Sequence, residues 1–253
     1  MVRAVQDLLP DESIIYLGDT ARVPYGSKSP ETIRRFAAED VRFLTERGVK
    51  AVVVACNTAT AHALPQLREE FELPVLGVIE PGVEAALADP QAERIGVIAT
   101  RGTIRSHAYQ HALAQRRPGV LILDHATPLL VPLIEEDWIE HPATDTILHT
   151  YLDPLTDRGV DTLLLACTHY PLLMDKLRKL LGPEVRLVDS ATTCAEHLRR
   201  VLNESGMLAR PASAAAPAHL EIPLTDLSEQ FEILARRFLR TPPPRIRRAE
   251  LQG

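Results

Sequence analysis

The chain carries one pattern twice, as RGVKAVVVAC at residues 47–56 and as RGVDTLLLAC at residues 158–167, at a constant offset (167 − 56 = 111). In each copy a short apolar run ends on a cysteine, and a helix-like stretch follows. Such runs are typical of buried strands in parallel sheets. Self-similarity at a fixed offset indicates a duplicated unit. We therefore expect an α/β fold of two pseudo-symmetric lobes with mainly parallel sheets, and an active site in the cleft between them.

Strand-like and helix-like stretches alternate along most of the chain. SIIYLGD (13–19) predicts a buried strand, and residues 29–48 predict a helix that Ser29 caps and Gly48 ends. Near the C-terminus, LTDLSEQFEILARRFLR (224–240) predicts a further helix, with Phe231, Leu234 and Phe238 at helical spacing. We expect the first lobe to comprise residues 1–79 and 189–253, and the second lobe residues 80–188.

The repeat also predicts a gap in the first lobe. The second lobe opens with a strand and turn, RIGVIATRGTIRSH (94–107), whereas the chain begins directly on helix-like VRAVQDLLPD (2–11). By this symmetry we expect the first lobe to lack an N-terminal strand and its turn.

Composition and charge narrow the class of protein. The 253 residues are 45% hydrophobic, enough for a core, and no apolar run reaches the roughly 20 residues of a membrane span. The net charge of −6 disfavours nucleic-acid binding, and we expect the basic RIRRAE segment (245–250) to be a solvated tail. The N-terminus lacks the apolar stretch of a signal peptide. We expect a cytoplasmic protein with no membrane or nucleic-acid partner, whose three cysteines are free thiols.

Two of the cysteines, Cys56 and Cys167, lie where a predicted strand ends. In parallel sheets ligands bind at that edge, and the N–H groups of a following helix stabilise anions, including thiolates. A cysteine ending an apolar run is more often a small buried residue, and we keep that interpretation for Cys194. Two thiols at equivalent positions of facing lobes, however, fit racemisation by two bases, each serving one face of an α-carbon. His169 either assists Cys167 or is an ordinary strand-end histidine.

Other kinds of site have less support. A zinc site needs closely spaced ligands, and the sequence contains no C-x-x-C pair. The phosphate-binding patterns G-x-x-x-x-G-K-[ST] and G-x-G-x-x-G and the hydrolase pattern G-x-S-x-G are also absent. No lysine lies in an evident Schiff-base context. We therefore expect neither a metal nor a cofactor.

Six segments resemble those of glutamate racemases, in the same order: GDTARVPYGSKS (18–29), ACNTATA (55–61), GVIEPG (77–82), VPLIEE (131–136), ACTHYPLL (166–173) and VDSA (188–191). The resemblance implies a cofactor-independent isomerase that interconverts L- and D-glutamate. It also implies a role in peptidoglycan synthesis and cell wall biogenesis, glutamate as the small-molecule partner, and a homodimer.

The resemblance assigns roles to particular residues. It implies that Cys56 and Cys167 are the catalytic thiols and that His169 acts beside the second thiol. Glu135, in the acidic VPLIEE segment, is implied to lie near His169, although a solvated helix residue is the alternative. The implied substrate-binding residues are Tyr25, Gly26, Asn57, Thr58, Thr168 and His169.

The sequence departs from the family at its start. Glutamate racemases begin with a strand and a D-S-G-x-G-G turn, whose Asp and Ser contact the substrate amino group, and this sequence begins after that turn. The expectation of a missing strand therefore follows from the resemblance as well as from the repeat. Three alternatives stay open: an aspartate racemase of the same superfamily, a decarboxylase that uses one thiol, and a truncated, catalytically inactive binding or regulatory protein.

Overall fold

The computed structural model describes residues 1–211, 218–239 and 246–251. The chain forms two compact units. The first unit comprises Met1–Val53, His62–Leu76 and Ala195–Gly253, and the second comprises Val54–Ala61 and Gly77–Cys194. The expected bounds of the two lobes, residues 1–79 with 189–253 and residues 80–188, stay a prediction.

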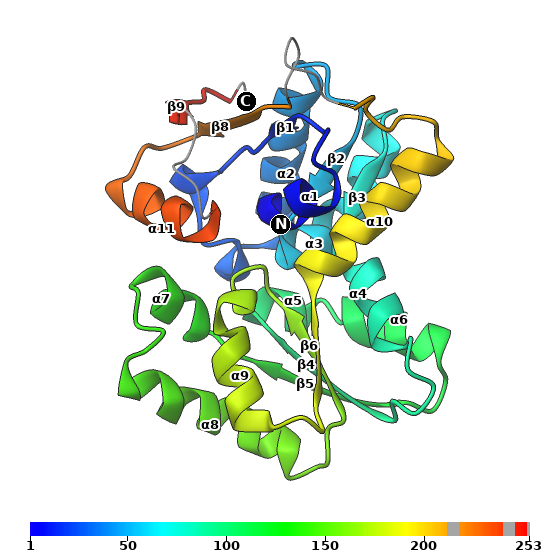
Figure 1. Cartoon of the computed structure of the whole chain (residues 1–253), viewed down its shortest axis with the longest axis vertical. Coiled ribbons are helices and arrows are strands. Elements are labelled where there is room, and N and C mark those ends of the chain that lie inside the picture. The colour runs from blue at the N-terminus through cyan, green and yellow to red at the C-terminus, as the bar shows by residue number, and fades with distance from the viewer. Residues whose placement is uncertain (212–217, 240–245, 252–253) are drawn as a thin grey trace. The chain divides into compact units, whose positions relative to one another are not determined.

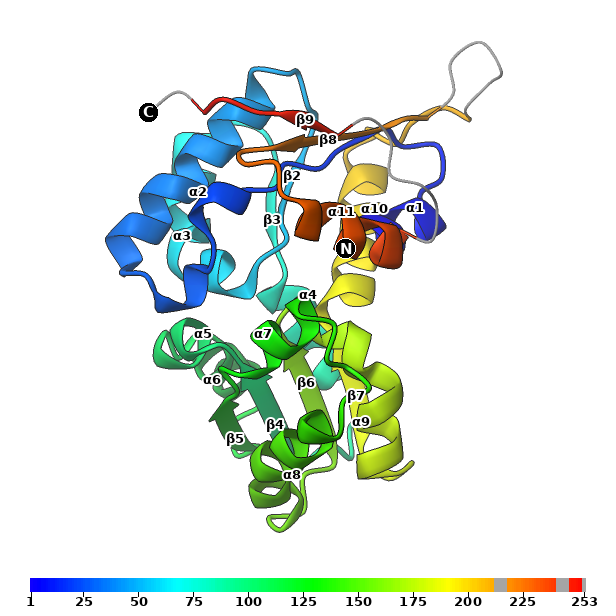
Figure 2. The same cartoon turned by 90° about the vertical axis from the view of Figure 1, so that its left-hand side faces the viewer.

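A four-stranded parallel sheet forms the centre of the second unit, in the order β5-β4-β6-β7 (Figure 2). Its strands are β4 (Arg94–Ala99), β5 (Leu121–Ala126), β6 (Thr162–Ala166) and β7 (Arg186–Asp189). The connecting helices are α4 (Ile79–Ala86), α5 (Arg101–Arg105), α6 (Ala108–Arg116), α7 (Leu130–Glu135), α8 (Pro142–Thr156), the 3₁₀ turn η3 (Tyr170–Leu173) and α9 (Met174–Leu181).

Side chains of β6 alternate between two cores, one on each face of this sheet. Leu163 and Leu165 pack with buried residues of α7, α8 and α9. Leu164 packs on the opposite face with residues of α4 and α6, which lie on the other side of the strands in Figure 1. Because both faces are covered, all five residues of β6 are buried, which explains its unbroken apolar run.

The first unit contains two smaller sheets. One is β1-β8-β9, built from β1 (Ile14–Ile15), β8 (Leu220–Leu224) and β9 (Ile246–Arg248), with parallel pairing throughout. The other pairs β2 (Val52–Val54) with β3 (Val75–Gly77). Its helices are α1 (Val2–Leu8), α2 (Pro30–Thr45) and α11 (Glu229–Leu239), and its 3₁₀ turns are η1 (Thr20–Arg22) and η2 (Tyr25–Ser27). Two further helices, α3 (Asn57–Glu70) and α10 (Ser190–Glu204), begin in the second unit and continue in the first, from His62 and from Ala195.

Two local features place the segment that follows β1. Gly18 bridges to Leu224 of β8, and a Cβ at Gly18 would lie only 2.5 Å from Leu224 Cδ2, so a larger residue there would displace the Leu224 side chain. The following α2 begins as expected, because Ser29 Oγ accepts a hydrogen bond from the N–H of Thr32. Residues 19–28 are thereby held between a strand and a helix start.

Several expected elements are confirmed, and others change. A helix does follow β8 as α11, although the side chains of Leu234 and Phe238 lie outside the described residues. The strand expected at 13–19 shortens to β1 and the Gly18 bridge. The strand β3 ends at Gly77, and α4 begins at Ile79 with a proline in its first turn, where its missing N–H removes no helical hydrogen bond.

One expectation about the C-terminal segment was wrong. RIRRAE is not a solvated tail, because Ile246 to Arg248 form β9 and satisfy the open edge of β8. The preceding TPPP lies outside the described residues. Pro65 does not interrupt α3, which runs from Asn57 to Glu70, with Leu64 and Leu67 buried on either side of the proline.

No helix among the described residues is long and apolar enough to cross a membrane.

Candidate active site

Cys56 lies on a short segment, Val54–Ala61, that belongs to the second unit. The repeat predicted that Cys56 and Cys167 would lie in opposite lobes, yet both belong to this unit. Side-chain hydrogen bonds explain the placement of the segment. Thr60 Oγ1 donates to the Val54 carbonyl at 3.0 Å and accepts from the N–H of Val78 at 3.4 Å.

The Cys56 thiol faces neutral groups at the start of α3. Its carbonyl accepts the first helical hydrogen bond, from the N–H of Thr60 at 2.8 Å, and its Sγ accepts from the N–H of Ala59 at 3.5 Å. Burial raises the pKa of the Cys56 thiol, and so does the charge of Cys167, whereas the N–H groups of Ala59 and Thr58 lower it. The net direction is upward, so Cys56 favours the protonated thiol.

Asn57 is buried, and both ends of its amide are bonded within the second unit. Tyr109 Oη donates to Asn57 Oδ1 at 2.7 Å, and Asn57 Nδ2 donates to Ser190 Oγ at 3.4 Å. Burial raises the pKa of Tyr109 well above its ordinary value, so its hydroxyl remains a donor. These two contacts fix the orientation of the Asn57 side chain at the start of α3.

Thr58 belongs to a group of three hydroxyls that the sequence analysis missed. Its Oγ1 lies 2.9 Å from Thr100 Oγ1 and 3.1 Å from Thr103 Oγ1, and these two lie 3.2 Å apart. Thr100 follows β4, the strand next to β6, so its position at the carboxyl edge of the sheet was a signal that could have found it. Three hydroxyls beside the start of α3 can bind a carboxylate.

Cys167 differs from Cys56 in having a charged partner. It follows β6 and precedes the 3₁₀ turn η3, rather than the α-helix that we expected. Its Sγ lies 3.8 Å from His169 Nδ1, and His169 Nε2 lies 3.1 Å from Glu135 Oε1. Burial lowers the pKa of His169, but its contacts with Cys167 and Glu135 raise it to about 10. His169 therefore carries a positive charge at neutral pH. Thr168, the residue between Cys167 and His169 in the sequence, is partly buried.

Tyr170 anchors the turn that carries these residues. Its ring is fully buried, and its hydroxyl lies 2.6 Å from Thr127 Oγ1 and 3.3 Å from the Thr127 carbonyl oxygen. Thr127 is fixed in turn, because its N–H donates to the Ala99 carbonyl at the end of β4. The position of Cys167 is therefore set by the sheet and by the turn together.

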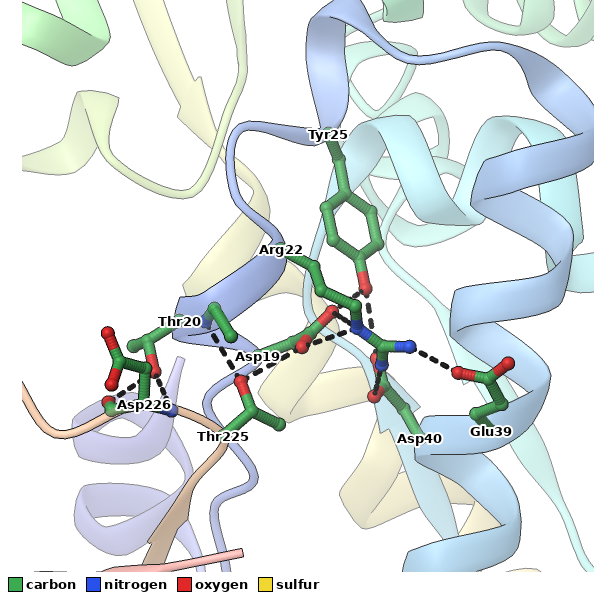
Figure 3. A network of polar contacts seen from close by, with 9 residues as sticks. Asp19, Thr20, Arg22, Tyr25, Glu39, Asp40, Thr225 and Asp226 are labelled. Atoms are coloured by element: carbon green, nitrogen blue, oxygen red, sulfur yellow. Dashed lines mark hydrogen bonds and ion pairs between the residues drawn. The ribbon is translucent and has the colours of Figure 1, made fainter. Parts of the chain in front are cut away.

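Tyr25 and Gly26 lie in the first unit, in the turn η2, and both are partly buried. The Tyr25 hydroxyl contacts the carboxylates of Asp19 and Asp40 (Figure 3). Because the hydroxyl is occupied in this way, any ligand at this turn would meet its backbone. Among the described residues, no group of three or more His, Cys, Asp or Glu side chains is arranged to hold a metal ion.

Comparison with known proteins identifies the family. Residues 1–198 match the Asp/Glu/hydantoin racemase family. Glutamate racemase of Geobacter metallireducens is 45% identical over 239 residues, which cover 94% of this chain and 87% of that protein. The structure of glutamate racemase isoform RacE1 from Bacillus anthracis matches with a TM-score of 0.91 at 36% identity, covering 99% of this chain and 92% of the other. The Francisella tularensis glutamate racemase, solved in complex with D-glutamate, matches with a TM-score of 0.90 at 32% identity, covering 98% and 92%. The chain therefore belongs to the glutamate racemase family.

Proposed function

We propose that this protein interconverts L- and D-glutamate by a two-base mechanism, with Cys56 and Cys167 as the bases. The observation that carries the proposal is the unequal pair of thiols in the second unit. One thiol faces neutral groups that leave it protonated, and the other faces a charged imidazole. Racemisation needs one base and one acid at the same time, and this pair supplies both.

In one direction of the reaction, Cys167 is the base and Cys56 is the acid. The charged imidazole of His169 lies 3.8 Å from the Cys167 sulfur, where it can stabilise the negative charge of a base. The Cys167 thiolate takes the α-proton from one face of glutamate, and the electron pair of the broken C–H bond stays on the α-carbon. Cys56 then gives its proton to the opposite face. The product leaves with Cys56 ionised and Cys167 protonated, which is the form that accepts the other enantiomer.

Each remaining site residue has a proposed role. The hydroxyls of Thr58, Thr100 and Thr103 bind a substrate carboxylate together with the N–H groups at the start of α3. Glu135 holds the orientation and charge of His169. Thr168, Asn57, Tyr25 and Gly26 are proposed substrate contacts. Because the two thiols supply acid and base, the reaction needs no cofactor.

The experiment is α-proton exchange in D₂O, with L- and D-glutamate offered separately and followed by NMR and by chiral analysis. We expect the natural chain to incorporate deuterium with inversion of either enantiomer. In Cys56→Ser and Cys167→Ser, racemisation falls by about 10³-fold or more, and each variant exchanges the α-proton of only one enantiomer, with retention. Cys194→Ala, which removes the third thiol of the second unit, is the matched control and should keep full activity.

Other outcomes have clear meanings. Undiminished racemisation in either serine variant contradicts the two-base mechanism. Faster exchange with aspartate than with glutamate favours an aspartate racemase, and no exchange with either favours an inactive binding protein. The supply of D-glutamate for peptidoglycan, a cytoplasmic location and a homodimer are proposals that rest on the family. Light scattering of the purified chain tests the homodimer.

A further inference from the structure

A cluster of charged and polar side chains surrounds Arg22 in the first unit, and we call it the Arg22 cluster: Asp19, Arg22, Tyr25, Glu39 and Asp40 (Figure 3). Arg22 Nε donates to both carboxylate oxygens of Asp19 at 2.8 Å, and its Nη2 donates to Asp40 Oδ1 at 2.8 Å. Its Nη1 donates to Glu39. The side chains of Arg22, Asp19, Glu39 and Asp40 are between 8% and 22% exposed, so water screens these contacts only weakly.

The cluster ties several distant segments to the turn η2. Asp19 follows β1, Asp40 lies on α2, and Tyr25 is the first residue of η2. Asp19 is itself fixed by Thr225, which follows β8 and donates from Oγ1 to Asp19 Oδ1 at 3.0 Å. The ring of Phe36 lies beside the cluster, with the Arg22 Cζ 4.2 Å from its centroid. The Tyr25 hydroxyl therefore connects η2 to Asp19, which follows β1, and to Asp40 on α2, and it reaches Thr225 through Asp19.

The number of hydrogens available to the Tyr25 hydroxyl favours an additional proton in the cluster. The Tyr25 hydroxyl has one hydrogen, yet it contacts Asp19 Oδ2 closely and lies 3.1 Å from Asp40 Oδ2. Burial, together with the charges of Asp40 and Asp19, raises the pKa of Tyr25 far above its ordinary value, so this hydroxyl stays neutral. If it donates to Asp19, the second contact is a hydrogen bond only when Asp40 carries the hydrogen.

The charges agree with this count. Within the described contacts, one guanidinium faces three carboxylates. Burial lowers the pKa of Arg22, but its hydrogen bonds and the surrounding carboxylates raise this pKa by more than burial lowers it. The guanidinium therefore remains charged. Burial and the negative charge of Asp19 raise the pKa of Asp40 to about 7, while Arg22 and the Tyr25 hydrogen bond lower it and Glu39 raises it. A proton on Asp40 brings the carboxylates closer to balance with Arg22.

We propose that Arg22 and Asp40 are positioning residues for substrate binding, which hold the Tyr25–Gly26 turn through the Tyr25 hydroxyl, and that a proton on Asp40 completes this hold. The inference rests on the proposed function, in which the backbone of this turn contacts glutamate. Loss of the proton adds a negative charge beside Asp19 and Glu39. The carboxylates of Asp19 and Asp40 then compete for the single hydrogen of the Tyr25 hydroxyl. Substrate affinity then falls, while the thiols in the second unit are unchanged.

The first experiment tests the proton without reference to catalysis. The natural chain and Asp40→Asn are labelled with ¹³C at the aspartate side-chain carboxyls and titrated by NMR. We expect one resonance to titrate with a midpoint near 7 in the natural chain and to be missing from Asp40→Asn. An Asp40 resonance that titrates near 4, as in model peptides, overturns the proposal.

The second experiment tests positioning through KM and kcat for glutamate, measured below and above that midpoint. The amide of Asp40→Asn can donate to Tyr25 at every pH. We therefore expect the ratio of natural to Asp40→Asn KM to rise about five- to tenfold as pH increases, with the kcat ratio within about twofold. Tyr25→Phe, which lacks the hydroxyl, should show the raised KM at every pH. Glu31→Gln is the matched control, since its exposed carboxylate lies on the same helix and pairs with Arg34 instead. It should behave as the natural chain.

The outcomes separate this inference from the proposed function. A chain that racemises glutamate but shows a flat KM ratio, or a raised KM in Glu31→Gln alone, overturns the positioning role and leaves the racemase intact. A chain that does not act on glutamate overturns the proposed function and the positioning role together, while the NMR midpoint still reports on the proton.

Discussion

Cys56 and Cys167 end matching segments of a repeated pattern, yet their surroundings differ in kind. Cys56 is contacted by backbone N–H groups at the start of α3, with the neutral hydroxyl of Thr58 nearby. Cys167 is contacted by an imidazole that a carboxylate supports. The N–H dipoles at a helix start carry only partial charges and can stabilise a thiolate that forms during the reaction. A full positive charge on an imidazole stabilises a neighbouring thiolate more strongly.

The difference shows how a duplicated fold can become an unequal pair. The repeat supplies two sulfur atoms at two strand ends, and the residues that follow each strand give the two sulfur atoms different neighbours. In the first copy the next residues, Asn57 and Thr58, begin an α-helix. In the second, His169 occupies a turn that is held by Tyr170, and its contact with Glu135 becomes possible. The proposed mechanism needs this inequality.

The largest expected effect comes from removing the charge beside Cys167. In His169→Ala, the Cys167 thiolate loses its positive neighbour, and kcat/KM should fall by about 10²–10³-fold. The fall must be equal in both directions, because the two enantiomers have the same free energy. Ultraviolet absorbance of the thiolate, taken as the difference from Cys167→Ser, should disappear at neutral pH in this variant.

His149→Ala is the control for this substitution. His149 lies on α8, exposed, and pairs with Asp153. Its loss should change neither the rate nor the absorbance. If the thiolate absorbance of His169→Ala equals that of the natural chain, the comparison between the two cysteines is wrong.

The sequence could predict the two cysteines and their strands because local patterns encode both. Apolar runs of five residues and a repeat can be recognised in the sequence without knowledge of tertiary contacts. Thr103 and Tyr109 carried no such signal, since only folding brings them to Thr58 and Asn57. The strand β9 was missed for the same reason: IRR is an exposed basic run until it pairs with β8.

The second prediction concerns the hydroxyls on the Cys56 side. Thr58→Val keeps the side-chain shape but removes its hydroxyl from the group formed with Thr100 and Thr103. We expect KM for glutamate to rise about tenfold and kcat to change little, because a carboxylate loses one donor. Thr144→Val is the control, because Thr144 is equally buried and its hydroxyl donates to the Trp138 carbonyl. An equal rise in KM in both variants would indicate general loosening of the second unit.

A smaller effect is expected from the support of Asn57. Tyr109→Phe removes the hydroxyl that donates to Asn57 Oδ1 and leaves that buried oxygen without this donor. The free energy of unfolding should fall by about 1–3 kcal/mol, measured by denaturant titration. The value of kcat/KM should fall only about two- to fivefold, since the amide orients the start of α3 rather than the reacting atoms. A loss of activity as large as that of His169→Ala would mean that Tyr109 takes part in the chemistry.

The smallest effect at neutral pH should come from Glu135→Gln, which tests how much the carboxylate adds to the charge on His169. Contacts with Cys167 and Glu135 raise the pKa of His169 from 6.5 to about 10, against the lowering by burial. Because the folded-state pKa is raised, the stability that this charge contributes is fully present below pH 6.5 and is lost as pH rises through about 10. The charge-dependent activity is lost over the same alkaline range.

Glu135→Gln weakens one of these contacts, so the alkaline limb of kcat/KM and the alkaline loss of stability should both move to lower pH. Glu135 is 41% exposed, and solvent screens its charge. We therefore expect a shift of less than about one pH unit and a change in rate at neutral pH of less than about twofold. Added salt should produce part of the same shift in the natural chain and little in the variant. An alkaline limb that stays in place in Glu135→Gln would leave Cys167 as the main source of the charge on His169, and the two thiols would then differ through one imidazole alone.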